Sequence, residues 1–113
     1  MTRDPQSLLP LTPAMFHVLV ALADTPRHGY AIMKDVERLT SGSMRLSTGT
    51  LYGIIKRLLA DGLVRELSAA GGDDERRRSY ALTAFGREVA RAEAARLEDS
   101  LALARTKQLF RQA

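Results

Sequence analysis

The segment from Ser47 to Gly62 most limits what this chain can fold into, because it reads as one strongly amphipathic helix. Ser47 is a candidate N-cap for the backbone N–H of Thr50, and Gly62 suits the left-handed residue that ends a helix. The apolar residues at helical spacing are Leu51, Ile54, Ile55 and Leu58. The opposite face holds Gly49, Tyr52, Gly53, Lys56, Arg57 and Ala60. The pattern predicts a helix with one buried face and one open face.

Two further helices are predicted before this segment. Residues 1–11 read as an arm, and Thr12 followed by Pro13 is a helix start, expected to lead a helix to about Asp24. A second helix is predicted over 29–39, and the TPRHG motif between the two reads as a turn.

Short strands and a long helix are predicted after it. Partial alternation indicates strands over 63–68 and 78–82, joined by a charged, glycine-containing loop. From Thr83 onward the chain looks helical to near its end. The predicted fold class is mainly α, an α+β winged helix-turn-helix: three helices, a two-stranded wing hairpin and one long C-terminal helix.

The composition of the 113-residue chain suits one small domain. Its net charge of +4, from 17 basic and 13 acidic residues, hints at an anionic partner. The absence of cysteine excludes disulfides and thiolate zinc sites. No apolar run reaches the roughly 18–20 residues of a membrane span, and the first residues lack the layout of a secretion signal. We therefore expect a cytoplasmic protein without a membrane partner.

The open face of the helix after Ser47 is suited to nucleic acid. Gly49 and Gly53 would let the backbone approach a groove wall, which is a reason to tolerate glycine at a cost of about 1 kcal/mol relative to alanine inside a helix. Lys56 and Arg57 have the length to reach phosphates or guanine edges. The alternative is an ordinary solvated face, because exposed lysine and arginine are common.

The loop between the two strands gives a mixed signal. The loop ends in three arginines that would bind a phosphate or enter a minor groove: Arg76, Arg77 and Arg78. Three acidic residues immediately precede them, so that residues 69–78 carry no net charge. We predict DNA contact through the arginine side, with a merely solvated loop as the alternative.

Four segments together resemble the PadR family of bacterial transcription regulators. They read LTPAMFHVLVAL, HGYAIMKDVE, STGTLYGIIKRLLADGLV and RRRSYALTAFGREV, and they cover roughly residues 11–90 in the family's order and spacing. The combination of GTLY, a following GLV and then R-x-Y-x-L-T-x-x-G is specific, whereas HGY alone would be weak.

The resemblance implies a homodimer that binds double-stranded DNA at an inverted-repeat operator, usually as a repressor. By position it carries DNA contact to the wing arginines and to Ser47, Thr48, Gly49, Thr50, Tyr52 and Lys56. It implies that Tyr30 packs near the start of the second helix and contacts the DNA backbone, and Tyr80 is expected to anchor the hairpin to the core. The single C-terminal helix resembles the family's short subgroup, some members of which bind flat aromatic compounds with the aid of tryptophan. This chain has no tryptophan, so a small-molecule effector is left as an open partner.

The C-terminal helix carries two apolar stripes on a helical wheel. One gathers residues 85, 89, 92, 103 and 110, and the other gathers residues 90, 94, 97, 101 and 104. Two stripes predict two covered surfaces, one against the chain's own winged helix and one against a partner subunit. A single wide stripe with alanine filler is the alternative. The candidate dimer-interface residues are Phe16, Leu19, Val89, Leu97, Leu101 and Ala104. The predicted divisions are an arm over 1–11, a winged helix-turn-helix DNA-binding domain over 12–82 and a dimerisation helix over 83–113.

Two other classes of protein were compared with this interpretation. Catalysis has little support, because His17 and His28 are the only histidines and neither a phosphate loop nor a G-x-S-x-G elbow occurs. We therefore expect no catalytic residue, no metal and no cofactor. The second class is a winged-helix module that binds proteins and never touches DNA, since a fold does not fix a function.

Overall fold

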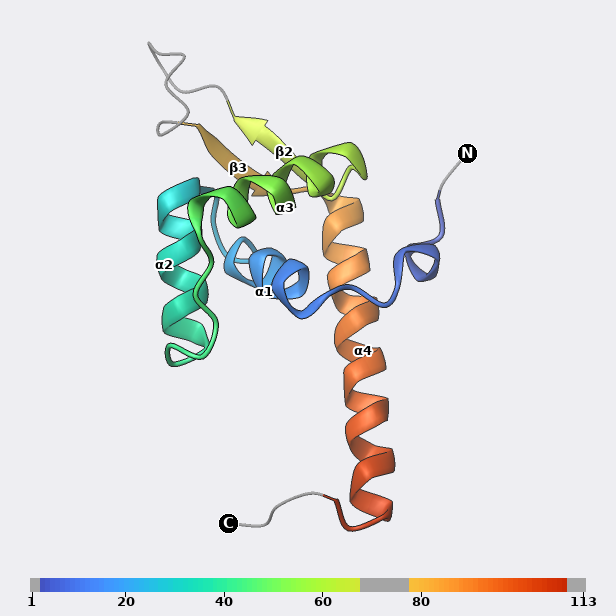
Figure 1. Ribbon diagram of the computed structural model, residues 1–113. Coiled ribbons are helices and arrows are strands. Elements are labelled where there is room, and N and C mark those ends of the chain that lie inside the picture. The colour runs from blue at the N-terminus through green and yellow to red at the C-terminus, as the bar shows by residue number, and fades with distance from the viewer. Residues whose placement is uncertain (1–2, 68–77, 110–113) are drawn as a thin grey trace.

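The structure is a computed structural model that describes residues 3–67 and 78–109. Its elements are η1 (Pro5–Leu8), α1 (Pro13–Ala21), β1 (Arg27–His28), α2 (Gly29–Leu39), α3 (Thr48–Ala60), β2 (Val64–Leu67), β3 (Ser79–Leu82) and α4 (Ala84–Thr106). Figure 1 shows α1, α2 and α3 grouped beside the β2–β3 hairpin, with α4 extending away from them. The predicted winged helix-turn-helix with one long C-terminal helix is confirmed.

Side-chain N-caps define the first residues of α1, α3 and α4. The Thr12 hydroxyl accepts the Met15 N–H at 3.1 Å, the Ser47 hydroxyl accepts the Thr50 N–H at 3.1 Å, and the Thr83 hydroxyl accepts the Gly86 N–H at 2.8 Å. Each bond satisfies one N–H that the first turn leaves free. These local bonds explain why the predicted starts of α1 and α3 agree with the structure.

Helix α1 ends earlier than predicted, at Ala21 instead of about Asp24. The N–H of Leu22 caps the last turn by bonding to the carbonyls of Val18 and Leu19. Pro26 follows shortly afterwards, and a proline disfavours helical backbone in the residue before it. That restriction acts on Thr25, after the helix has ended, and the chain then forms β1 at Arg27–His28.

The sheet has three strands in the order β1-β3-β2, so the predicted two-stranded wing was incomplete. Arg27 and His28, predicted as part of a turn, pair antiparallel with Tyr80 and Ser79. A two-residue strand has no alternation to read, and its hydrogen bonds come from a partner far along the chain. The hairpin itself pairs Val64 with Leu82 and Leu67 with Ser79.

One apolar core lies beneath α3. Leu51, Ile55 and Leu58 are fully or almost fully buried, and Tyr80 joins them at 3% exposure, which confirms its predicted anchoring role. Leu19 and Val89 are also at 0% exposure within this single chain. They were predicted at a dimer interface, and that prediction was wrong because their own core leaves them no surface for a partner.

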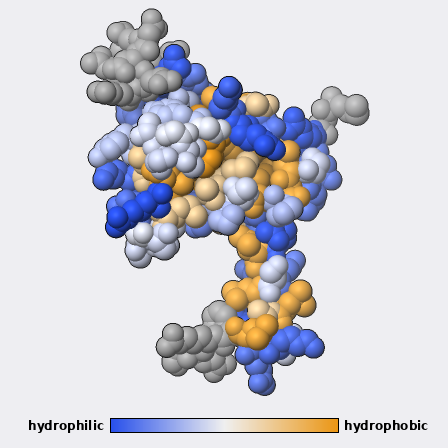
Figure 2. Space-filling model, in the orientation of Figure 1, coloured by the Kyte–Doolittle hydropathy of each residue, from blue (hydrophilic) through white to orange (hydrophobic). Residues whose placement is uncertain are grey.

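Helix α4 leaves the core after its first turns. Figure 2 shows apolar surface on the part of α4 that extends from the body, where Leu97, Leu101 and Leu103 are 40%, 39% and 68% exposed. Among the described residues, no helix combines the length and the apolar character that crossing a membrane requires.

Candidate nucleic-acid interface

The outer face of α3 is open in the way that the sequence predicts. Gly49, Gly53, Lys56 and Arg57 are all exposed, and a β-carbon added at either glycine would meet no other atom within 4 Å. Packing among the described residues therefore requires neither glycine. A bare strip of backbone beside two basic side chains is a surface that another molecule can approach closely.

The first turn of α3 orients its hydroxyl groups. Ser47 caps the helix through the Thr50 N–H and donates its own O–H to the Thr50 hydroxyl oxygen at 2.9 Å. These two bonds use the Thr50 N–H and one lone pair of its hydroxyl oxygen, so the hydroxyl keeps its own hydrogen for donation. Thr48 is exposed beside it.

Tyr52 has a packing role that the sequence did not reveal. It is half-buried, and a β-carbon at Gly29 would overlap its hydroxyl and ring. Gly29 is the first residue of α2, so Tyr52 rests where only glycine leaves room. This contact fixes the start of α2 beside α3.

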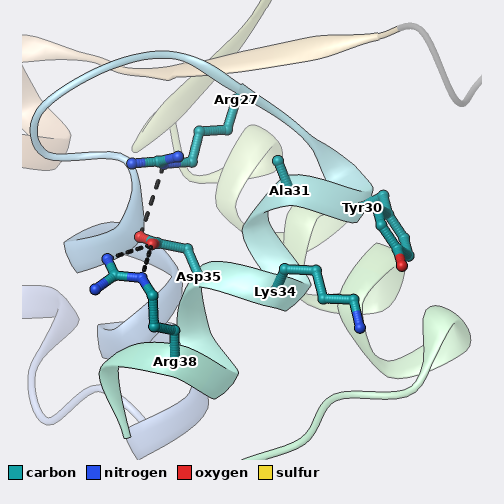
Figure 3. Close-up of a pocket in the computed structure, with 6 residues that line it drawn as sticks. All are labelled: Arg27, Tyr30, Ala31, Lys34, Asp35 and Arg38. Atoms are coloured by element: carbon teal, nitrogen blue, oxygen red, sulfur yellow. Dashed lines mark hydrogen bonds and ion pairs between the residues drawn. The ribbon is translucent and has the colours of Figure 1, made fainter.

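Tyr30 and Lys34 extend the open face onto α2. A hollow of about 340 Å³ lies on this side of α2. Figure 3 shows the six residues that line it: Arg27, Tyr30, Ala31, Lys34, Asp35 and Arg38. Arg38 pairs with Asp35 at 2.6 Å, and Arg27 lies 3.4 Å from Asp24 and 3.7 Å from Asp35, so the two guanidinium groups face two carboxylates. The Lys34 ammonium instead lies 5.5 Å from the centre of the Tyr30 ring, which is 65% exposed.

Lys34 was absent from the predicted site residues. Its spacing of four residues from Tyr30 places the two on one face of α2 and was the available signal. The contact of the ammonium with the ring face is a cation–π interaction, which directs a positive charge to the flank of α3.

Of the three predicted wing arginines, the structure describes Arg78. Arg76 and Arg77 lie outside the described ranges. Arg78 pairs with Glu66 across the hairpin at 3.0 Å. Its charge is thus partly compensated, and a DNA phosphate would compete with Glu66 for it.

Arg57 is tied to the end of its own helix. Its Nε lies 3.4 Å from a carboxylate oxygen of Asp61, four residues further on. Asp61 also accepts, through its backbone carbonyl, a hydrogen bond of 3.3 Å from Arg3. Arg57 is 72% exposed, so the pair orients the guanidinium without burying it.

Both histidines have local structural roles. The His17 ring donates from Nδ1 to the Pro13 carbonyl at 2.7 Å, and His28 Nδ1 lies 3.2 Å from the Ser79 hydroxyl. Within residues 3–67 and 78–109, no group of three or more metal-ligating side chains comes together.

A second exposed surface lies between α1 and α4. A shallow groove of about 180 Å³ there includes Phe16, Val20, Ala90 and Ala94 in its lining. Further along α4, Leu97 and Leu101 continue the apolar surface, and Ala104 is half-buried. The four remaining predicted interface residues, Phe16, Leu97, Leu101 and Ala104, thus all keep surface that this chain does not cover.

Comparison with known proteins gives one family and one fold. The sequence model of the transcriptional regulator PadR-like family matches residues 18–92. An uncharacterized 37.1 kDa protein in transposon TN4556 of Streptomyces fradiae is 46% identical over 81 residues. That match covers 72% of this chain and 22% of the relative, so the chain spans about a fifth of the relative's length.

Two solved structures illustrate the fold. A PadR family transcription regulator from Clostridium difficile is 21% identical with a TM-score of 0.68, over 83% of this chain and 96% of that one. Bacillus subtilis PadR in complex with operator DNA is 18% identical with a TM-score of 0.63, over 74% of this chain and 47% of that one.

Proposed function

This chain belongs to the PadR-like family of transcriptional regulators, and we propose that it represses transcription by binding an inverted-repeat operator as a homodimer. The observation that carries the proposal is the bare outer face of α3. Gly49 and Gly53 leave its backbone uncovered, and Lys56 stands exposed beside them. Such a helix fits the major groove, where side chains read base edges.

In the proposed complex, the first turn of α3 faces the DNA backbone. Its free N–H groups and the outward hydroxyls of Thr48 and Thr50 donate to phosphate oxygens. Lys56 and Arg57, one to two turns further along, reach base edges or the opposite strand. Tyr52 acts mainly by holding α2 against α3, with its hydroxyl at the edge of this surface.

The flank formed by Tyr30 and Lys34 contacts the phosphates beside the groove. The ring holds the ammonium near the start of α2, and Tyr52 packs that start against α3. A lysine supplies a point charge to a phosphate and carries no sequence information. The wing arginines would add a contact of the same kind, with Arg78 leaving Glu66.

The homodimer is proposed to form through α4 and the groove beside α1. Phe16, Leu97, Leu101 and Ala104 offer apolar surface that water would otherwise cover, and its burial against an identical surface is favourable. A two-fold axis would then present two α3 helices to major grooves about 34 Å apart, or a multiple of that distance. A small-molecule effector that bound beside this groove would act by changing the seam.

In this proposal each of the three predicted parts of the chain has its own role. We assign DNA binding to residues 12–82 and dimerisation to the segment 83–113, which contains α4, and the arm before Thr12 joins the two. The structure of Bacillus subtilis PadR supports the proposal, because a protein of this fold is bound to operator DNA there. A cytoplasmic location follows from the proposed role, since the operator lies in the cytoplasm.

Binding to duplex DNA at increasing salt concentration tests the proposed function. The affinity should fall steeply, with log K losing roughly 0.9 per neutralised phosphate for each unit of log salt. If Lys56 contacts phosphate, Lys56→Ala weakens operator and mixed-sequence DNA alike. If Lys56 reads a base, the loss is concentrated on the operator, at about 1–3 kcal/mol. A chain that binds no duplex at low salt contradicts the proposal and fits a protein-binding module instead.

A further inference from the structure

The start of α4 is pinned to the end of α3. The Thr83 N–H bonds to the Leu63 carbonyl at 3.1 Å, and the Thr83 hydroxyl bonds to the Gly62 carbonyl at 2.7 Å. A β-carbon at Gly86 would overlap the Leu63 carbonyl, so the first turn of α4 touches the backbone that follows α3. The start of α4, which we propose for dimerisation, is therefore fixed to the end of α3, which we propose for DNA binding. We call this contact the pivot.

A buried carboxylate holds the N-terminal arm (residues 3–11) to α4 beyond this pivot. Glu93 is 1% exposed, and its Oε2 accepts the N–H of Leu11 at 3.1 Å. Arg96 donates to both carboxylate oxygens, at 2.5 and 3.1 Å. The hydrogen bond from Arg96 lowers the pKa of Glu93 below its usual value, against the opposing effect of burial. A charged acceptor thus fixes the arm at one point of α4.

The other end of the arm returns to α3. Arg3 donates to the backbone carbonyl of Asp61, the residue that caps the end of α3 and pairs with Arg57. The Arg3 guanidinium also lies 5.8 Å from the centre of the Phe85 ring in the first turn of α4. Between these ends, Leu8 and Leu9 pack against the core, and Figure 1 shows the arm crossing α4.

We propose that the N-terminal arm is a strap that fixes the angle between α3 and α4, with Arg3 and Glu93 as positioning residues for operator recognition. The first turns of α4 are held against the core, where Val89 is fully buried and Arg87 donates to the Ala23 carbonyl at 2.8 Å, whereas the rest of the helix extends from the body (Figure 1). Glu93 lies ten residues beyond Thr83, which is about 15 Å along a helix, so a tie at this point controls the tilt of α4. In a homodimer built on α4, that tilt sets the separation of the two α3 helices and hence the half-site spacing that the protein accepts.

This inference rests on the proposed function, because spacing has meaning only for a dimer on an operator. The test uses the full chain and the duplex that it selects from a random DNA library. Three probes are compared: that duplex, the same duplex with one base pair inserted between the half-sites, and the duplex with one half-site scrambled. The variants are Arg3→Ala and Glu93→Gln. Their controls are Lys107→Ala, which removes an exposed positive charge, and Glu98→Gln, an exposed glutamate on α4.

If the arm acts as a strap, both variants should discriminate less between the selected and the lengthened duplex. A loss of stability alone would not cause this change. The ratio of affinities for the selected and the lengthened duplex should fall about tenfold in both variants, the effect of one charged hydrogen bond. Affinity for the scrambled probe and the sedimentation of the dimer should stay as in the controls. Arg3 is exposed, so Arg3→Ala keeps the fold and stays informative if Glu93→Gln unfolds.

An unchanged ratio in Arg3→Ala overturns the strap, as does an equal loss on all three probes. The proposed function would survive either result, because the parent chain still selects a duplex. A parent chain that selects no duplex overturns the proposed function and the strap together.

Discussion

Gly53→Ala should raise the stability of the protein and lower its affinity for DNA. Gly53 lies in the interior of α3, where an added β-carbon meets no atom within 4 Å. Alanine is better than glycine inside an exposed helix by roughly 0.8–1 kcal/mol. In a chain of this size that gain corresponds to a rise in Tm of about 4 °C.

The same methyl group would lie between α3 and the wall of the groove in the proposed complex. Overfilling a close-packed contact costs about 1–3 kcal/mol, which is roughly a 5- to 150-fold loss in operator affinity. Urea denaturation followed by circular dichroism measures the first effect. Fluorescence anisotropy with a labelled operator at fixed salt measures the second.

Ser100→Ala is the matched control. Ser100 is exposed in α4, and its replacement by alanine also raises helix propensity. It should raise the free energy of unfolding by a smaller amount and leave operator affinity unchanged. If Gly53→Ala stabilises the protein and binds the operator as tightly as the parent, α3 does not approach DNA closely at Gly53, and the reasoning is refuted.

Three other changes give separate tests. Leu101→Asp places a charge on the proposed seam and should convert the dimer to a monomer in sedimentation velocity; a variant that still sediments as a dimer would move the seam elsewhere. The lowered pKa of Glu93 means that its stabilising effect is present above the ordinary carboxyl pKa and is lost as the pH falls through the lowered value. Glu93→Gln should therefore lower the free energy of unfolding by about 1–2 kcal/mol at pH 7 and by progressively less in acid; a pH-independent difference in urea titrations would contradict this. Lys34→Ala should reduce the salt slope of DNA binding by roughly 0.9, one phosphate contact, and an unchanged slope would remove Lys34 from the interface.

The parts of the fold that could be predicted depend on neighbours in the sequence. Ser47 and Gly62 bound α3 through bonds within a few residues, and the buried face of α3 follows from its periodicity. The strand formed by Arg27 and His28 was missed because it exists only through pairing with Ser79 and Tyr80.

In the candidate site, too, features set by neighbouring residues could be predicted and features set by distant contacts could not. The outer face of α3 could be read from one helical wheel, because the residues are consecutive. A wheel cannot tell which molecule covers an apolar stripe, and for this reason Leu19 and Val89 were assigned to a partner although their own core encloses them. The tie between Leu11 and Glu93 joins residues 82 positions apart, and no local pattern indicates it.

Directed cleavage of DNA from the end of α3 tests the central claim most directly. The chain contains no cysteine, so Ala60→Cys gives a single attachment point for an iron–EDTA reagent on the exposed face of α3. We predict two cleavage clusters on the operator, centred about 10 base pairs or a multiple apart and offset across the major groove, with none from Gln108→Cys at the far end of α4. A single cluster, or equal cleavage from both positions, would contradict the claim that two α3 helices enter the duplex.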